Sequence, residues 1–205
     1  AATQFEGFIA YHQGEAEIWE EMALTRARIV AGDPALGQRA EAAIRDILRR
    51  RRDPAKVAAA VAEMRALIAK EKGEADPWDL KLAAGGLTDL DFLAQFLVLA
   101  HAHDHPELLA RTTAGVFQAA RGTGLIAEED ALRLAEAARL LGDVQLWQRF
   151  TVEERFDPKA VPERVLRRIA TAVGLPDAKV LKAELDETRG RVRALFRQIL
   201  AAAKG

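Results

Sequence analysis

The 205-residue sequence contains no cysteine, no serine and no asparagine. Without cysteine, the chain has no disulfide, no thiolate metal site and no cysteine nucleophile. Without serine, hydrolysis by a serine nucleophile is excluded. A cysteine-free chain also fits a reducing compartment, and we expect a cytoplasmic protein.

The charges of the chain nearly cancel. Thirty Lys and Arg residues face 31 Asp and Glu residues, giving a net charge of -1. Bulk attraction to nucleic acid or to an anionic membrane is therefore not expected. No apolar run is long enough to span a bilayer, and the first residues lack a secretory pattern. We therefore expect neither a nucleic-acid partner nor a membrane partner.

Helical periodicity dominates the sequence, because apolar residues recur every three or four positions. No alternating strand pattern and no repeat of fixed period is visible. The fold class predicted is all-α, an up-and-down helical bundle with additional C-terminal helices. The segment "FDPKAVPE" carries two prolines and divides the chain into a bundle at 1–155 and a helical extension at 156–205 packed on it. Helices are expected over 3–30, 35–50, from 54 to the connector at 72, 88–101, 105–122, 127–147, and from 162 and 181 onward.

The stretch "DLKLAAGGLTDLDFLAQ", residues 79–95, differs from the rest of the chain. Lys81 and the pair Gly85-Gly86 precede a helix N-terminus, where free N–H groups and a close backbone approach favour phosphate contact. The spacing matches neither a Walker A loop nor a dinucleotide-binding fingerprint, and no strand precedes it. Two alternatives stay open: a phosphate-handling loop, or a loop that only starts a buried helix.

Asp89 and Asp91 have the D-x-D pattern of two-metal nucleotidyl-transfer centres. Residues two apart on a helix diverge, so we assign no metal ligand and no catalytic residue here. Thr88 followed by Asp91 three residues later instead predicts a capping box. Asp89 is then left to favour the helix dipole or to meet a basic partner.

Arg26 interrupts an otherwise apolar seam of the first predicted helix. A guanidinium in such a position needs a carboxylate, backbone carbonyls or a bound phosphate. The internal alternative is a salt bridge to Asp89, Asp91 or Glu15. The external alternative is a phosphate or a neighbouring domain.

Three stretches together resemble a known family: "WEEMALTRARIVAGDP" (19–34), "DLKLAAGGLTDLDFLAQFLVLAHA" (79–102) and "ETRGRVRALFRQIL" (187–200). They are similar, in the same order, to the bacterial bifunctional glutamine synthetase adenylyltransferase/adenylyl-removing enzyme. The likeness is to the helical domain that follows its second nucleotidyltransferase domain, a substrate-binding-domain type of bundle. The family's middle motif reads approximately K-L-x-x-G-G-hydrophobic-x-D-hydrophobic-E-F. The matching positions are Lys81, Gly85, Gly86, Asp89 and Phe92, and in the first motif Trp19, Arg26 and Arg28.

Asp91 departs from the family pattern, which usually has glutamate there. The shorter carboxylate suits a capping role and leaves a longer-range contact in doubt.

The resemblance implies an activity for the parent protein: transfer of AMP from ATP to glutamine synthetase, with Mg²⁺, under control of a PII-type signalling protein. The family's catalytic domain carries a glycine-serine turn, and a chain without serine lacks it. The resemblance therefore implies a piece that starts after the catalytic sheet and ends at the natural C-terminus, with no cofactor expected on the chain alone. Its partners would be glutamine synthetase, the PII-type protein and the preceding nucleotidyltransferase domain.

The leading hypothesis is a companion domain, inert by itself, that positions nucleotide or protein substrate. Its candidates for facing the nucleotide or the catalytic domain are Arg26, Lys81, Gly85, Gly86 and Asp89. A second hypothesis is a regulatory docking module for the PII-type protein or glutamine synthetase that makes no nucleotide contact. A third is the related helical domain of the PII uridylyltransferase, which the order of the motifs disfavours.

Overall fold

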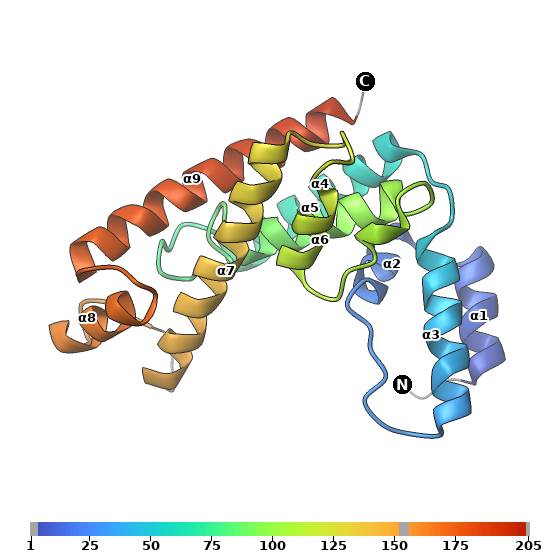
Figure 1. Cartoon of the computed structure of the whole chain (residues 1–205), viewed down its shortest axis with the longest axis horizontal. Helices are drawn as coiled ribbons and strands as arrows, with labels where there is room; N and C mark the ends of the chain where they lie inside the picture. The colour runs from blue at the N-terminus through green and yellow to red at the C-terminus, as the bar shows by residue number, and fades with distance from the viewer. Residues whose placement is uncertain (1–3, 152–155, 204–205) are drawn as a thin grey trace.

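The computed structural model describes residues 4–151 and 156–203, and all regular structure within those ranges is helical. The all-α class predicted from the sequence is confirmed. Figure 1 shows an arch, with α7, α8 and α9 on one side and α1 and α3 on the other. The elements are α1 (Phe5–Gly14), α2 (Ile18–Leu24), α3 (Pro34–Leu48), α4 (Pro54–Lys72), α5 (Leu87–His101), the 3₁₀ turn η1 (Pro106–Leu108), α6 (Thr113–Ala120), α7 (Glu128–Thr151), α8 (Glu163–Ala172) and α9 (Ala178–Ala202).

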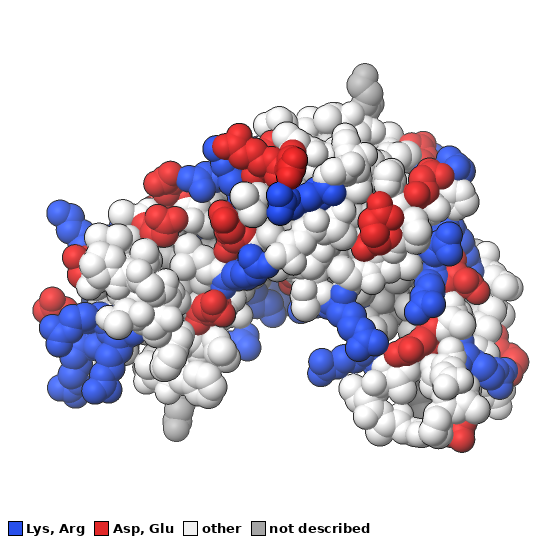
Figure 2. Space-filling view, viewed as in Figure 1, with Lys and Arg blue, Asp and Glu red and all other residues white. Residues whose placement is uncertain are grey.

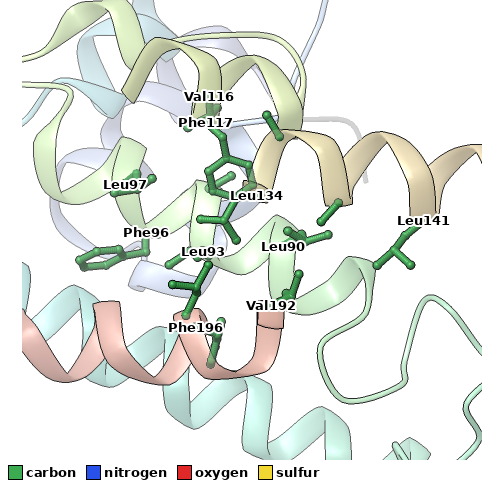
Figure 3. Packing of buried hydrophobic residues seen from close by; sticks show 14 of the residues in the cluster. Leu90, Leu93, Phe96, Leu97, Val116, Phe117, Leu134, Leu141, Val192 and Phe196 are labelled. Atoms are coloured by element: carbon green, nitrogen blue, oxygen red, sulfur yellow. The ribbon is translucent and has the colours of Figure 1, made fainter. Parts of the chain in front are cut away.

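Helix α5 forms the centre of the hydrophobic core. It contacts α2, α4, α6, α7 and α9, and ten of its fifteen residues are buried. A helix that is buried over most of its circumference can only be stable when other elements surround it. In Figure 3, Leu90 and Leu93 of α5 lie beside Val192 and Phe196 of α9.

Two helices begin with the aspartate-proline signal that the sequence carries. The Asp53 carboxylate accepts a hydrogen bond from the Ala55 amide at 2.9 Å, and Pro54 is the first helical residue of α4. Asp33 and Pro34 start α3 in the same way. Proline is suited to this position because its missing N–H would have no helical partner there.

Two predicted helices are wrong in extent. Residues 3–30 do not form one helix, because α1 ends at Gly14 and Glu17 caps α2 through a reciprocal bond with Glu20. The chain then leaves helical structure at Thr25 and runs irregularly to Asp33, while Thr3 lies outside the described residues. The second error is 105–122, where the chain forms η1 and, after a break, α6.

Helix α9 packs along the core through residues spaced three or four positions apart. Leu181, Leu185, Thr188, Val192 and Leu195 are buried, and Ile199 is half-buried. The helix contacts α4, α5, α7 and α8. The boundary drawn between 155 and 156 stays a prediction, since 152–155 lie outside the described residues. Within the described ranges, no helix is both long and apolar enough to cross a membrane.

Gly85 allows α9 to approach the loop between α4 and α5. Its φ is +76°, a left-handed conformation that side chains disfavour. A Cβ atom at Gly85 would collide with the backbone carbonyl oxygen of Arg189 on α9. The neighbouring Gly86 is equally confined, since its Cβ would lie 2.5 Å from the Leu80 carbonyl oxygen. The double glycine is therefore required by close packing of two backbones.

We expect Gly85→Ala to lower the free energy of unfolding by at least about 2 kcal/mol, from the left-handed backbone and the collision with α9. Urea titration followed by circular dichroism measures this. Gly190→Ala is the matched control, because Gly190 lies in α9 beside Arg189 with open space around it. Alanine there should stabilise the helix by up to about 1 kcal/mol. Equal stability of Gly85→Ala and the parent chain would contradict the packing role.

A candidate cation-lined cleft

An open cleft lies between α5, α7, the start of α6 and the irregular segment after α2. Its volume is about 620 Å³. Asp91 and Gln95 of α5 are one turn apart, as are Gln145 and Arg149 of α7, so one face of each helix is turned toward the same space. The polar lining residues are Thr25, Arg26, Arg28, Lys81, Asp91, Gln95, Arg111, Thr112, Thr113, Gln145 and Arg149.

Asp91 fixes the rim of the cleft. One of its carboxylate oxygens accepts a hydrogen bond from Arg26 at 2.5 Å, and the other accepts one from the Thr113 hydroxyl at 2.5 Å. These bonds join the segment after α2, the middle helix α5 and the start of α6. The Arg26 side chain is still 62% exposed, so one face of its guanidinium remains open to a ligand.

Cations outnumber anions around the cleft. Arg28, Lys81, Arg111 and Arg149 form no ion pair within residues 4–151 and 156–203, and all four are exposed. Asp91 is the one carboxylate that the described part of the chain contributes to the lining. A second hollow, lined by Arg45 and Glu41, shares Arg26, Arg28 and Arg111 with the cleft. In Figure 2, blue side chains flank the hollow beneath the arch. Converging, unpaired cations attract a polyanion, because phosphate oxygens accept their hydrogen bonds.

Asp89 lies on the opposite side of α5, in the interior. It is 0% exposed and forms salt bridges with Arg65 of α4 and, at 3.1 Å, with Arg193 of α9. The Gly85 amide donates to the same carboxylate at 2.6 Å, and Glu74 pairs with Arg65 at 2.8 Å. We call these five residues the Asp89 network. A buried carboxylate of this kind is stable only because its charge and lone pairs are matched.

The candidates from the sequence therefore divide into two groups. Arg26 and Lys81 border the cleft. Gly85 and Asp89 are buried instead against α9 and α4, and Gly86 is buried within its own loop, beside the Leu80 and Ala83 carbonyl oxygens. This differs from the expectation that all five face the nucleotide or the catalytic domain, because Gly85 already admits the α9 backbone and Gly86 the carbonyl oxygens of its own loop.

The capping box predicted from Thr88 and Asp91 is wrong. Helix α5 begins at Leu87 with Gly86 as its N-cap and no side-chain cap. Thr88 is buried inside the first turn, and Asp91 instead holds Arg26 and Thr113. The prediction failed because α5 begins at Leu87, which places Thr88 inside the first turn instead of at the N-cap. The salt bridge from Arg26 to Asp91, one of the alternatives left open, is present.

Some important residues were missed by sequence reasoning. Arg65, only 2% exposed, lies in α4 on the buried side of a Val57 and Val61 stripe. An arginine in phase with an apolar stripe is a signal for an ion pair, and the pair of Arg65 is buried whereas that of Arg26 is exposed. Arg111 and Arg149 carried no comparable signal, because their convergence depends on how α6 and α7 pack. No group of three or more His, Asp and Glu side chains able to hold a metal occurs in the described part of the chain.

The fold and the cleft define an all-α domain with a cleft lined by cations. Residues 56–200 match the family described as GlnD PII-uridylyltransferase, and residues 1–43 match the family described as glutamate-ammonia ligase adenylyltransferase. The first match covers more than half of the chain, which therefore belongs to that family.

Relatives along nearly the whole chain are bifunctional glutamine synthetase adenylyltransferase/adenylyl-removing enzymes. The protein from Bradyrhizobium diazoefficiens is 45% identical over 97% of the chain, and that from Rhodopseudomonas palustris 44% over 97%. The protein from Xanthobacter autotrophicus is 41% identical over 98%. The chain spans only 20% of the length of each of these relatives.

We expect Asp89→Asn to lower the free energy of unfolding by about 3–5 kcal/mol, because Arg65 would remain buried without its full countercharge. Glu187→Gln is the control, since Glu187 pairs with Arg191 at 2.5 Å on an exposed surface of α9 and its loss should cost under about 1 kcal/mol. Urea titration of both variants provides the comparison. Equal effects of the two substitutions would contradict the central role of Asp89.

Proposed function

We propose that the chain is the helical companion domain of an enzyme that transfers AMP from ATP to glutamine synthetase. The names of its relatives support this activity for the longer protein. In this proposal a nucleotidyltransferase domain of the same protein performs the chemistry, and the helical domain positions the nucleotide or the protein substrate. By itself the chain is expected to be inactive.

The observation that supports the proposal is the meeting of Arg26 and Lys81 at one cleft. These residues are far apart in the sequence, on the segment after α2 and on the glycine loop. Phosphoryl and nucleotidyl transfer depend mainly on positioning and on charge stabilisation of the phosphates. A rigid wall of cations supplies both, without a nucleophile or a base of its own.

The residues of the cleft fit phosphate groups better than they fit Mg²⁺. Magnesium needs carboxylate or phosphate oxygens, and Asp91 is already bonded to Arg26 and Thr113. The ion, when bound in the longer enzyme, would neutralise phosphate charge and would take its protein ligands from the catalytic domain. Arg26 and Lys81 would orient the phosphates from the opposite side.

In the full-length enzyme, we expect Lys81→Ala and Arg26→Ala each to lower the adenylylation rate at least about tenfold, because each removes a charged phosphate contact. Transfer of radiolabelled AMP to glutamine synthetase measures the rate. Arg26→Lys should restore part of the activity, since it keeps the charge but loses the planar donor set.

Two exposed cations outside the cleft serve as controls. Lys56 of α4 is matched to Lys81, and Arg39 of α3, paired with Glu6 at 3.3 Å, is matched to Arg26. Their alanine variants should retain the parent rate within about twofold, as surface substitutions usually do. Folded Lys81→Ala and Arg26→Ala enzymes with full activity would refute the site assignment.

A second candidate function is docking of the PII-type signalling protein or of glutamine synthetase itself. The observation that favours it is an exposed apolar group at the end of α7, formed by Leu146, Trp147 and Phe150, with Phe150 75% exposed. Large exposed aromatic side chains are typical of contact surfaces between proteins.

The docking hypothesis predicts that a PII-type protein binds the chain in calorimetry and that Phe150→Ala weakens this binding at least about tenfold, as loss of an aromatic anchor does. Lys81→Ala should leave it unchanged. Binding that depends on Lys81 and is indifferent to Phe150 would favour the cleft instead.

A further inference from the structure

Three exposed arginines share one face of α8. Arg164, Arg167 and Arg168 recur at helical spacing, and in Figure 2 blue side chains gather over this helix. None of the three forms an ion pair within the part of the chain that the structure describes, although Glu163 precedes Arg167 by one turn. Like charges one turn apart destabilise a helix, so the stability of α8 does not explain this arrangement.

Other exposed arginines of the chain pair with carboxylates of their own helix. Arg133 pairs with Glu129, and Arg191 pairs with Glu187, each at 2.5 Å and one turn apart. A guanidinium matches a carboxylate because its planar set of donors meets both oxygens. The arginine face of α8 presents the same donors without paired carboxylates, so a partner that brings carboxylates would supply the missing contacts.

The opposite face of α8 is already packed. Ile169 is fully buried, and Val165 and Leu166 pack against the hydrophobic core. The helix contacts both α7 and α9. A helix that anchors a protein to a bilayer inserts its apolar face into the lipid. Because that face of α8 is covered, its arginines are left as a contact surface and do not belong to a membrane anchor.

Exposed apolar side chains lie at the same end of the molecule. Helix α8 contacts α7, and Figure 1 shows it next to the C-terminal end of α7. That end exposes Leu146, Trp147 and Phe150. We call these three residues and the three arginines of α8 the α7–α8 surface. Tryptophan and arginine are the residue types enriched at the energetically important centre of protein–protein contacts.

The α7–α8 surface fits a protein better than a nucleic acid. A single strand of nucleic acid stacks its bases on open aromatic faces. Here the Trp147 and Phe150 rings pack edge to face, with centroids 6.3 Å apart, and Leu146 extends the same apolar group. The net charge of -1 also gives the chain no long-range attraction for a polyanion.

We infer that the α7–α8 surface binds an acidic segment of a partner protein, whose carboxylates pair with the three arginines while an apolar side chain packs on Trp147 and Phe150. This inference rests on the docking function proposed for the end of α7 and adds the chemistry of the partner to it. It involves neither the cation-lined cleft nor the transfer of AMP.

The test measures fluorescence anisotropy of a labelled synthetic peptide, in which every fourth residue is leucine and the others are glutamate, with the 205-residue chain at low salt. The combined variant Arg164→Gln, Arg167→Gln and Arg168→Gln should weaken binding at least about tenfold, because each substitution removes a charged contact. A peptide of equal charge with glycine in place of leucine should bind the parent chain at least about threefold more weakly, since it makes no apolar contact with Trp147 and Phe150.

The matched control removes three exposed cations from another helix. Lys56, Lys70 and Lys72 of α4 form no ion pair within residues 4–151 and 156–203. Their combined glutamine variant changes the net charge by the same amount and should keep the peptide affinity within about twofold. Equal weakening in the two combined variants would mean that the peptide senses only net charge, which would overturn the inference.

Photo-crosslinking locates the bound peptide on the parent chain, so the inference stays falsifiable even if the combined arginine variant fails to fold. A benzophenone group in place of one leucine should label residues 146–150 or α8. Labelling confined to the cleft between α5 and α7 would overturn the inference.

Further probes separate this inference from the docking function. Single-stranded oligothymidylate or phosphatidylserine vesicles that bind through the α8 arginines more tightly than the peptide would overturn the protein partner. Absence of peptide binding to the parent chain would overturn the proposed chemistry. In either case calorimetry with the PII-type protein and Phe150→Ala would still decide the docking function.

Discussion

The burial of the Asp89 carboxylate is the constraint on which the rest of the structure depends. Its charge is matched by Arg65 from α4 and Arg193 from α9, and its second oxygen accepts the Gly85 amide. The Asp89 side chain of α5 thus connects this helix to α4, to α9 and to the loop that carries Gly85. Removal of one partner would leave a buried charge without its countercharge. The packing of α4, α5 and α9 against one another therefore depends on all three charged side chains. The apolar core supplies most of the driving force, and the Asp89 network selects the register in which the helices meet.

The same helix then builds the candidate site on its other side. Asp89 and Asp91 are two residues apart, so their side chains leave α5 about 200° apart around the helix axis. Each of the two carboxylates has bonding partners on its own side of the helix. Asp89 points into the interior, whereas Asp91 reaches the cleft and holds Arg26 and Thr113. Gln95 lies one turn farther along on the cleft side. Any displacement of α5 would move the core ion pair and the cleft rim together, so the core holds Arg26 at the rim through Asp91.

A residue of the site could be predicted only where its local sequence distinguishes it from an ordinary solvated side chain. Arg26 and Lys81 could be singled out because a charged residue interrupts an apolar stripe or accompanies a glycine pair. Arg111, Arg149 and Gln95 could not, since nothing in their local sequence distinguishes them from solvated side chains. For the glycine pair, the sequence left two alternatives open, a phosphate-handling loop and a loop that only starts a buried helix, for a physical reason. A close backbone approach is required by a phosphate and by a second helix alike, and the sequence does not say which one arrives.

By itself, the sequence determined the helical class, the exclusion of cysteine and serine chemistry, most of the helix starts and the buried stripe of α9. These depend on local rules: the spacing of apolar residues, the aspartate-proline caps and the residue types that are present. Only the tertiary structure decided that Asp89 faces two arginines, that Gly85 faces the Arg189 carbonyl oxygen, and that cations from four separate segments surround one cleft. Those facts depend on distances between residues up to 104 positions apart in the chain. Such distances are set by how the helices pack, which no local pattern encodes.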